Sequence, residues 1–307
     1  MERTHGQPGI TLTLVTGGLW AEDPQTDDRR DYLIADVFTD TPLEGNQLGV
    51  FLDARGMTTD LMQRTTRELN LSETVFFLPA DNSKADAAVR IFTPASELPF
   101  AGHPCLGAAF VLAERLGKRN ITLETGVGLI PLEFADDGFG QMEQQIPPAE
   151  PYQDTKNLLD ALGLDDSELP VEAYRNGPRH VYVALPDMDA VANLKPDFGK
   201  LKQHAASVNC FAGHGAAWKT RVFVPYLGVN EDPATGSAAG PLGVHLARHG
   251  RIGFGQPIVV SQGMEIHRPS TLYITIEGAG HTIEHVYVGG YTVVVAHGQY
   301  RLIGSQG

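Results

Sequence analysis

Two short stretches place glycine and polar residues directly before apolar segments with helical character. "FAGHPCLG" at 100–107 contains His103, and "EDPATGSAAGPLG" at 231–243 contains Asp232 and Ser237. A buried helix N-terminus carries unpaired N–H groups and a partial positive charge. If the two helix starts converge, the pair forms a site for a carboxylate, and the glycines allow a ligand to approach the backbone closely. We therefore ask whether they face one another, and which side chains do chemistry there.

Glu73, in "LNLSETVFF", is the best candidate for a base because it opens an apolar strand. A carboxylate in that position is paired, capping or catalytic, and buried charges are most often structurally paired. A helix N-terminus should keep His103 neutral at pH 7, so that it donates or accepts a hydrogen bond; its alternative role is a cap. Asp232 could equally be a turn residue and Ser237 an N-terminal turn hydroxyl.

Other motifs that would indicate a different chemistry are missing. Ser237 is not in a GxSxG nucleophile elbow. "HLARH" at 245–249 lacks the glutamate of a zinc-protease motif, so we expect both histidines on the helix surface or in its last turn. The sequence has no dinucleotide fingerprint, no P-loop and no CxxC pair. These absences predict a protein that needs neither a metal nor a cofactor.

Composition narrows the class of partner. The chain has 307 residues, of which 42% are hydrophobic and 20% charged, enough for two domains with a large core. Its net charge of −14 argues against binding nucleic acid or an anionic membrane. No apolar run approaches the roughly 20 residues of a membrane span, and residues 1–30 make a poor signal peptide. We expect a loosely ordered N-terminal extension and a cytoplasmic protein.

The element pattern predicts an internal duplication. Helices are expected at 60–69 (capped by Thr58 or Thr59), 103–116, 155–162 and 236–249, among many short strands rich in β-branched residues. The helices at 103–116 and 236–249 are apolar nearly all round, which is typical of buried helices. Each ends at a glycine, and the proline-rich "IPPAEP" separates the two halves. A buried helix wrapped by strands, occurring twice, indicates an α+β fold.

These segments resemble the PhzF family, the isomerases of phenazine biosynthesis, from about residue 32 to the C-terminus. The resemblance is carried by the following stretches: "DVFTDTPLEGNQLGVF", "RELNLSETVFF", "RIFTPASELPFAGHP", "YRNGPRHVYVALP", "NCFAGHG", "EDPATGSAAGPLGVHLARHG" and "GQPIVVSQGMEIHRPS".

The resemblance implies a diaminopimelate-epimerase-like fold, in which each of two pseudo-symmetric domains rolls an antiparallel sheet around a central helix. The expected boundaries are 31–146, completed by a C-terminal strand at 290–303, and 147–289. The implied reaction isomerises trans-2,3-dihydro-3-hydroxyanthranilate, a small zwitterionic cyclic amino acid, to the aminoketone precursor of phenazines by proton transfer from C3 to C1. A homodimer without cofactor is implied.

The family's functional positions fall on specific residues of this chain. Its acid/base falls on Glu73, in "NLSE", and its other catalytic positions on His103, Asp232 and Ser237. Substrate-binding positions are expected at the following residues: Asn46, Ser72, Gly102 and Gly236.

Three alternatives remain open. A two-base racemase on the same fold would use a cysteine at each helix start, but Ser237 lies in "TGSAAG", without a thiol. A non-catalytic protein that binds a small zwitterion would not need Glu73 and His103. A related isomerase or epimerase could act on another small amino-acid-like substrate, because motifs at the catalytic centre do not specify the ring.

Overall fold

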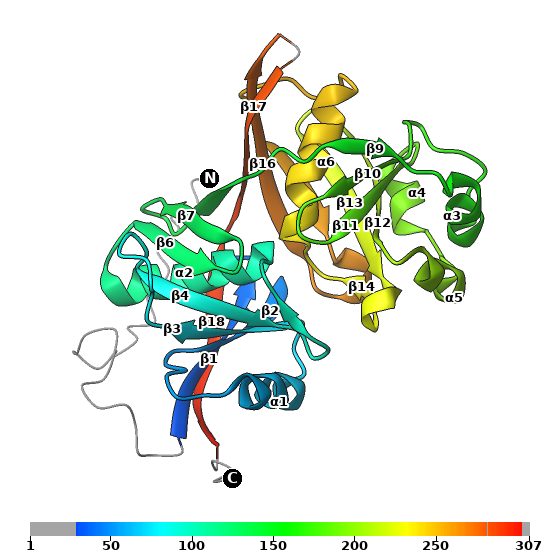
Figure 1. The fold of residues 1–307 in the computed structure, drawn as a ribbon. Coiled ribbons are helices and arrows are strands. Elements are labelled where there is room, and N and C mark those ends of the chain that lie inside the picture. The colour runs from blue at the N-terminus through cyan, green and yellow to red at the C-terminus, as the bar shows by residue number, and fades with distance from the viewer. Residues whose placement is uncertain (1–28, 281, 303–307) are drawn as a thin grey trace, which may run out of the picture.

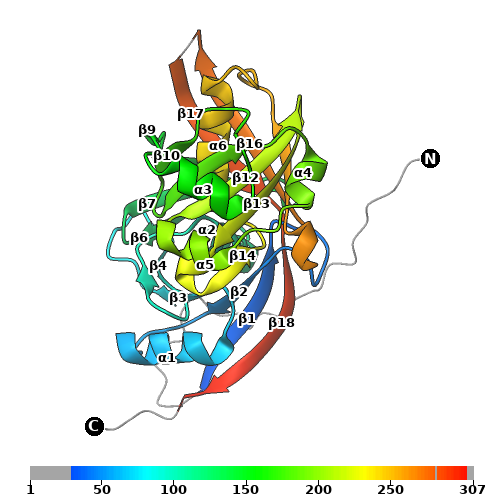
Figure 2. The same cartoon turned by 90° about the vertical axis from the view of Figure 1, so that its right-hand side faces the viewer.

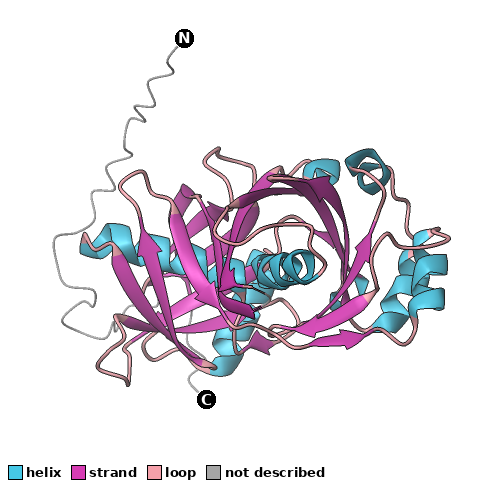
Figure 3. Cartoon of the chain, turned by 90° about the horizontal axis from the view of Figure 1, so that it is seen from above, coloured by secondary structure: helices cyan, strands magenta, loops and turns pink. Residues whose placement is uncertain are grey.

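Two helices, α2 (Gly102–Leu116) and α6 (Gly236–Arg248), form the centres of two similar halves of the molecule (Figure 1). The computed structural model describes residues 29–280 and 282–302, so residues 1–28 of the expected extension lie outside the described part. Seen from above, strands curl around a helix in each half (Figure 3). No helix in the described ranges is both long and apolar enough to cross a membrane.

The two halves repeat one pattern of strand pairing. In each, six successive pairings run antiparallel, parallel, antiparallel, parallel, antiparallel, antiparallel. The first half uses these strands: β1 (Arg29–Val37), β2 (Asn46–Phe51), β3 (Glu73–Leu78), β4 (Ala87–Phe92), β6 (Asn120–Thr125), β7 (Gly128–Phe134) and β8 (Gly140–Gln144). The second uses these: β10 (Glu172–Arg175), β11 (Arg179–Ala184), β12 (Ser207–His214), β13 (Ala217–Val224), β15 (Ile258–Gln262), β16 (Ser270–Ala279) and β17 (Thr282–Gly290).

Shorter elements complete each half. The strands are β5 (Glu97–Leu98), β9 (Ala149–Pro151), β14 (Val229–Asp232) and β18 (Thr292–Arg301). The helices are α1 (Thr59–Leu69), α3 (Thr155–Leu162), α4 (Met188–Ala192) and α5 (Phe198–Leu201), with short 3₁₀ turns η1 (Lys202–His204), η2 (Pro225–Leu227) and η3 (Met264–Ile266). Thr58 caps α1 by accepting a hydrogen bond from the Leu61 N–H, as its sequence predicts.

The sheets are mixed, whereas the resemblance led us to expect antiparallel ones. In the first half β2 pairs with β3 in parallel, and β4 pairs with β6 in parallel. Parallel neighbours need a crossover connection, and α1 and α2 supply these two crossovers. The central helix of each half is therefore the crossover between two strands that lie side by side, which explains why it is enclosed by the sheet.

The pairing of β8 with β17, from Gln144–Val286 to Gly140–Gly290, joins the two halves into one continuous sheet. The last strand, β18, pairs with β1 along its whole length. Figures 1 and 2 show β1 (blue) and β18 (red) lying side by side. The C-terminal strand thus completes the sheet of the first half.

Glycines let the central helices approach their surroundings. A Cβ at Gly107 of α2 would lie 2.6 Å from a methyl of Leu48, and a Cβ at Gly243 of α6 would lie 2.6 Å from a methyl of Ile274. Real Cβ atoms do not tolerate such separations, so the strands pack directly on the helix backbone at these two points.

The first residues of the two helices are in backbone contact. A Cβ added to Gly102 would lie 2.8 Å from both the Gly236 carbonyl carbon and the Ser237 nitrogen. A Cβ added to Gly236 would lie 3.1 Å from the His103 nitrogen. The two helix N-termini therefore converge, as the sequence led us to ask, and only glycine allows this separation.

We expect Gly102→Ala to separate the two helix starts. Because the new methyl meets backbone atoms that cannot rotate away, the cost should be about 1–3 kcal/mol of unfolding free energy. Gly253→Ala is the matched control, since a Cβ there meets nothing within 4 Å, and it should change stability by less than about 0.5 kcal/mol. Urea titration of both variants checks this; equal stability of the two would contradict the contact.

Candidate active site

A pocket of about 630 Å³ opens where the two helix starts meet. Its wall combines both halves of the molecule: the starts of α2 and α6, the 93–100 loop, the start of β11 and the 224–232 segment. Seven of the eight expected site residues line it: Ser72, Glu73, Gly102, His103, Asp232, Gly236 and Ser237. Segments far apart in the sequence therefore meet in one cavity.

Glu73 and His103 face each other in this pocket. The Glu73 Oε2 atom lies 3.2 Å from the His103 Nε2 atom, and their side chains are 17% and 5% exposed. The contact is close but does not have hydrogen-bond geometry, and both atoms lack another partner among the described residues. Burial lowers the pKa of His103 to about 3, so its ring is neutral at pH 7.

The Asn46 side chain lies between His103 and the carboxylate of Asp232. Its Nδ2 atom lies 3.0 Å from the Asp232 Oδ1, 2.9 Å from the Ala234 carbonyl oxygen and 3.4 Å from the His103 Nδ1. The two hydrogens of this amide are taken by the Asp232 and Ala234 oxygens, so its approach to the His103 Nδ1 does not decide which ring nitrogen of His103 carries the proton. Asn46 has no exposed surface and is not part of the pocket wall. Its amide donates to Asp232 and Ala234, and the expected role of Asn46 in substrate binding stays a prediction.

Two carboxyl groups of the pocket, those of Glu73 and Asp232, have raised pKa values. Burial, and then the negative charge of Asp232, raise the pKa of Glu73 well above its usual value. Burial also raises the pKa of Asp232 to about 6, although hydrogen bonds from Thr235 and Asn46 oppose the shift. Thr235 donates to the Asp232 Oδ2 over 2.5 Å. The pair therefore holds protons at pH values where exposed carboxyl groups would be ionised.

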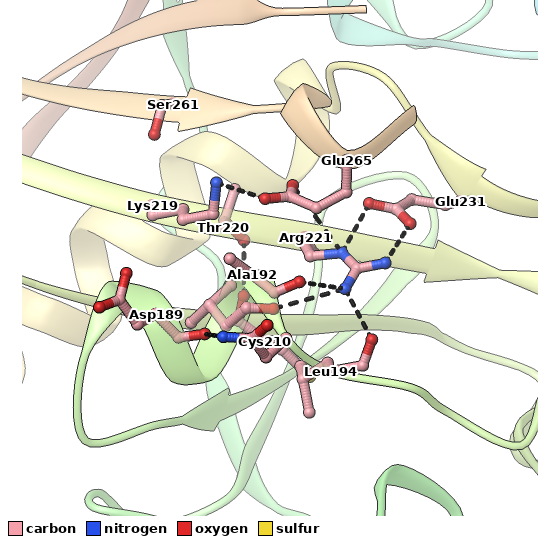
Figure 4. Close-up of polar contacts among 12 residues, drawn as sticks. Asp189, Ala192, Leu194, Cys210, Lys219, Thr220, Arg221, Glu231, Ser261 and Glu265 are labelled. Carbon is pink, nitrogen blue, oxygen red and sulfur yellow. Dashed lines mark hydrogen bonds and ion pairs between the residues drawn. The ribbon is translucent and has the colours of Figure 1, made fainter. Parts of the chain in front are cut away.

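A buried ion pair holds the segment that carries Asp232. The Arg221 guanidinium on β13 donates to both oxygens of Glu231 over 2.9 and 2.7 Å, in a bidentate pair. Its remaining nitrogen donates to the Ala192 and Leu194 carbonyl oxygens over 3.2 and 2.9 Å (Figure 4). Because Glu231 precedes Asp232, this pair fixes the position of β14 and hence of the catalytic candidate.

Neither helix start carries a side-chain cap in the described structure, so its N–H groups remain available to a ligand. Pro241 lies inside α6 and has no N–H to donate to the Ser237 carbonyl oxygen four residues earlier. Asn176 takes this role, since its Nδ2 donates to the Ser237 oxygen over 2.9 Å. It also donates to the Gln144 Oε1 over 2.8 Å, and Gln144 donates to the Gly236 oxygen over 3.0 Å.

Sequence reasoning missed Asn176, Gln144 and His180. Asn176 and Gln144 stabilise the first turn of α6, and His180 lines the pocket. The proline inside α6 was a visible signal that a carbonyl there needs an outside donor. No sequence pattern indicated which side chain would supply it.

His245 lies in the last turn of α6, one of the two expected placements, but it is not on the helix surface. Its side chain is fully buried, with Nδ1 3.1 Å from the Glu172 Oε2. His249 Nε2 lies 3.1 Å from the same oxygen, and the three groups have the spacing of metal ligands. However, Arg248 donates to that oxygen over 3.0 Å and supplies the positive charge that a metal would bring. We therefore interpret this group as a structural hydrogen-bond cluster.

The two cysteines do not belong to the pocket wall. Both Cys105 and Cys210 are fully buried, and burial raises the pKa of the Cys105 thiol to about 12. A thiol base requires a thiolate that can reach the substrate. The structure thus gives no support to a racemase with a thiol at each helix start.

We expect Asp232→Asn to stabilise the folded protein at neutral pH. The folded-state pKa of about 6 lies above the value of 3.8 for an unburied Asp, so the native state binds the proton more tightly. Stability is therefore lost as pH rises from about 4 through about 6, and asparagine avoids this loss.

Urea unfolding at pH 4 and pH 8 checks this expectation. The variant should gain on the order of 3 kcal/mol over the parent at pH 8 and little at pH 4. The same gain at both values would show that ionisation of Asp232 is not the cause.

Comparison with known proteins identifies the family of this chain. The family model of the PhzC-PhzF, phenazine biosynthesis-like proteins matches residues 35–298. A trans-2,3-dihydro-3-hydroxyanthranilate isomerase from Pseudomonas fluorescens is 47% identical over 273 residues, covering 87% of this chain and 98% of its own. The enzyme of the same name from Pseudomonas aeruginosa is 46% identical over 276 residues, covering 88% and 99%.

Solved structures show the same fold. A predicted epimerase from Pseudomonas aeruginosa superposes with a TM-score of 0.76 at 32% identity, covering 88% of this chain and 99% of its own. A hydroxyproline epimerase from Agrobacterium vitis, with a TM-score of 0.61 at 14% identity over 92% of this chain and 95% of its own, shares the fold alone. Family model, sequence relatives and fold agree, and the chain belongs to the PhzC-PhzF family of phenazine biosynthesis-like proteins.

Proposed function

We propose that this chain is an isomerase that converts trans-2,3-dihydro-3-hydroxyanthranilate to the aminoketone precursor of phenazines. The observation that carries the proposal is the Glu73 carboxyl, buried in the pocket with a raised pKa and 3.2 Å from a neutral His103. A base of this kind, held in the wall of a pocket that can receive a small molecule, suits proton abstraction from carbon. The isomerases of that name in two Pseudomonas species support the choice of substrate.

The pocket offers a partner for each charged group of this substrate. Its carboxylate would bind at the uncapped starts of α2 and α6, where backbone N–H groups and two helix dipoles converge. Its amine would lie against Asp232, which accepts hydrogen bonds from Asn46 and Thr235 and is thereby fixed in orientation. Apolar residues of the wall, among them Leu98 and Phe100, suit the ring.

A single carboxylate completes the reaction without external reagents. Ionised Glu73 takes the proton from C3, and the electron pair of the broken C–H bond moves through the ring diene to C1. Glu73, now protonated, returns the proton to C1 and becomes ionised again. The resulting C3 enol then tautomerises to the ketone. His103 Nε2, beside the carboxyl, would hold it in place between the two transfers.

A related substrate for the same chemistry is the second candidate. Several relatives of this chain are described only as uncharacterized isomerases, among them one from Mesorhizobium japonicum at 34% identity. Turnover by the purified protein, followed by absorbance and mass spectrometry, separates the candidates. Failure to convert the dihydro-hydroxyanthranilate would favour the second.

We expect Glu73→Gln to fold but to lose turnover by about 10²- to 10⁴-fold, because an amide cannot accept the proton. Glu97→Gln is the control: Glu97 pairs with Arg90 outside the pocket and should leave the rate nearly unchanged. Steady-state rates and thermal unfolding of both variants check this. A folded Glu73→Gln protein within about tenfold of the parent rate would exclude Glu73 as the base.

The pH profile tests the coupling of the two carboxyl groups. Only ionised Glu73 accepts a proton, so kcat/KM should rise with pH through its raised pKa. Because the Asp232 charge raises that pKa, Asp232→Asn should move the acid limb of its residual activity to lower pH. Titration of the substrate is common to both proteins and cancels. An acid limb that stays in place or moves upward would exclude the coupling.

A further inference from the structure

His180 is a fully buried histidine whose two ring nitrogens both lack a hydrogen-bond partner among the described residues. Buried polar atoms in folded proteins are nearly always hydrogen-bonded, so this ring calls for an explanation. Two other buried histidines, His103 and His245, each have a ring nitrogen in a hydrogen-bond contact, to Asn46 and to Glu172.

The strand geometry places His180 on the face of β11 that packs around α6. It is the second residue of β11, where Val181 and Val183 pack in the apolar cluster around α3. Tyr182 and its neighbours on the opposite face pack around α6, and the Tyr182 hydroxyl donates to the Ala238 oxygen over 2.6 Å. Because side chains alternate along a strand, His180 shares this face, about 7 Å from Tyr182.

His180 belongs to the wall that the second half contributes. Beside it in the pocket are Gly177, Pro178 and Ser207, the last being its neighbour on β12. Glu73 reaches the same cavity from the first half. A ligand held between them would give the orphaned ring a partner that the protein itself does not supply.

The charge state of the ring selects the kind of partner. Burial lowers the pKa of His180 to about 3, so the ring is neutral at pH 7. A contact between the ring and the Asn176 backbone opposes this shift to a smaller extent, but it does not have the geometry of a hydrogen bond. A neutral imidazole has one donor and one acceptor nitrogen. A hydroxyl group also donates and accepts, and it matches such a ring better than a carboxylate does. The helix starts and Asp232 are already suited to the carboxylate and the amine.

We propose that His180 is a substrate-binding residue that hydrogen-bonds the ring hydroxyl of the substrate. The inference rests on the proposed function, because it takes the substrate as a cyclic hydroxy amino acid. The same oxygen becomes the enol and then the ketone oxygen, so His180 would hold it from substrate to product. Recognition of this group would distinguish the substrate from an analogue without the hydroxyl.

A binding cycle with two ligands tests the proposal without requiring turnover. The ligands are 3-hydroxyanthranilate and anthranilate, aromatic analogues that differ only in the hydroxyl group. Calorimetry on the parent protein should show about tenfold tighter binding of the hydroxylated ligand, since its loss leaves a buried polar group unpaired. In His180→Phe the ratio of the two dissociation constants should fall to about one. If His180 had only a structural role, the substitution would weaken the binding of both ligands equally and leave the ratio unchanged.

Two further variants make the cycle specific. Tyr182→Phe, on the same face of the same strand but outside the pocket wall, should leave the preference intact. His180→Gln restores a hydrogen-bond donor and an acceptor, so it should recover part of the preference for the hydroxylated ligand.

The results separate this inference from the proposed function. No preference in the parent protein, or an undiminished preference in folded His180→Phe, would overturn the role of His180, even if the parent converts the substrate. If His180→Phe loses the preference for the hydroxylated ligand but the parent does not convert the substrate, the role of His180 in hydroxyl binding is supported. The same outcome counts against the proposed function.

Discussion

The contact between the backbones of Gly102 and Gly236 is the constraint on which the site depends. It brings the starts of two buried helices together, and a side chain at either position would force them apart. Their combined partial charges and unpaired N–H groups create a local preference for an anion in a chain whose net charge is −14. Strands packed directly on the helix glycines hold both helices in place, so the geometry is a property of the whole core.

Burial gives the two carboxyl groups of the pocket their properties. Glu73 and Asp232 come from different halves and line the same pocket, where burial desolvates both carboxyl groups. The shared environment raises both pKa values, while the same burial keeps His103 neutral. One physical effect, burial, therefore raises the pKa of both carboxyl groups and leaves the His103 ring without charge. Two carboxyl groups with raised pKa values lower the free energy of unfolding of the ligand-free protein at neutral pH.

Amide side chains connect the two halves where charged groups would be costly. Asn46, from the first half, donates to Asp232 and Ala234 of the second half. Asn176 donates to the Ser237 carbonyl oxygen at the start of α6, because Pro241 has no N–H to do so. Neutral amides donate and accept without the desolvation cost of an ion. The buried Arg221–Glu231 pair is the exception, and there all three guanidinium nitrogens have acceptors.

The sequence by itself determined the local features: the strands, the two apolar helices with their glycine ends, the duplication, and the candidates Glu73, His103, Asp232 and Ser237. These follow from short-range periodicity and from residue types that have few alternative uses. Only the tertiary structure decided which groups meet. Contacts between segments far apart in the chain decide which strands pair in parallel and why His245 is buried. They also decide why Asn46 does not line the pocket and why the ring of His180 lacks a partner. The local sequence pattern carries no information about such contacts. Which strands pair and which side chains lose contact with water depends on the residues that folding places next to them.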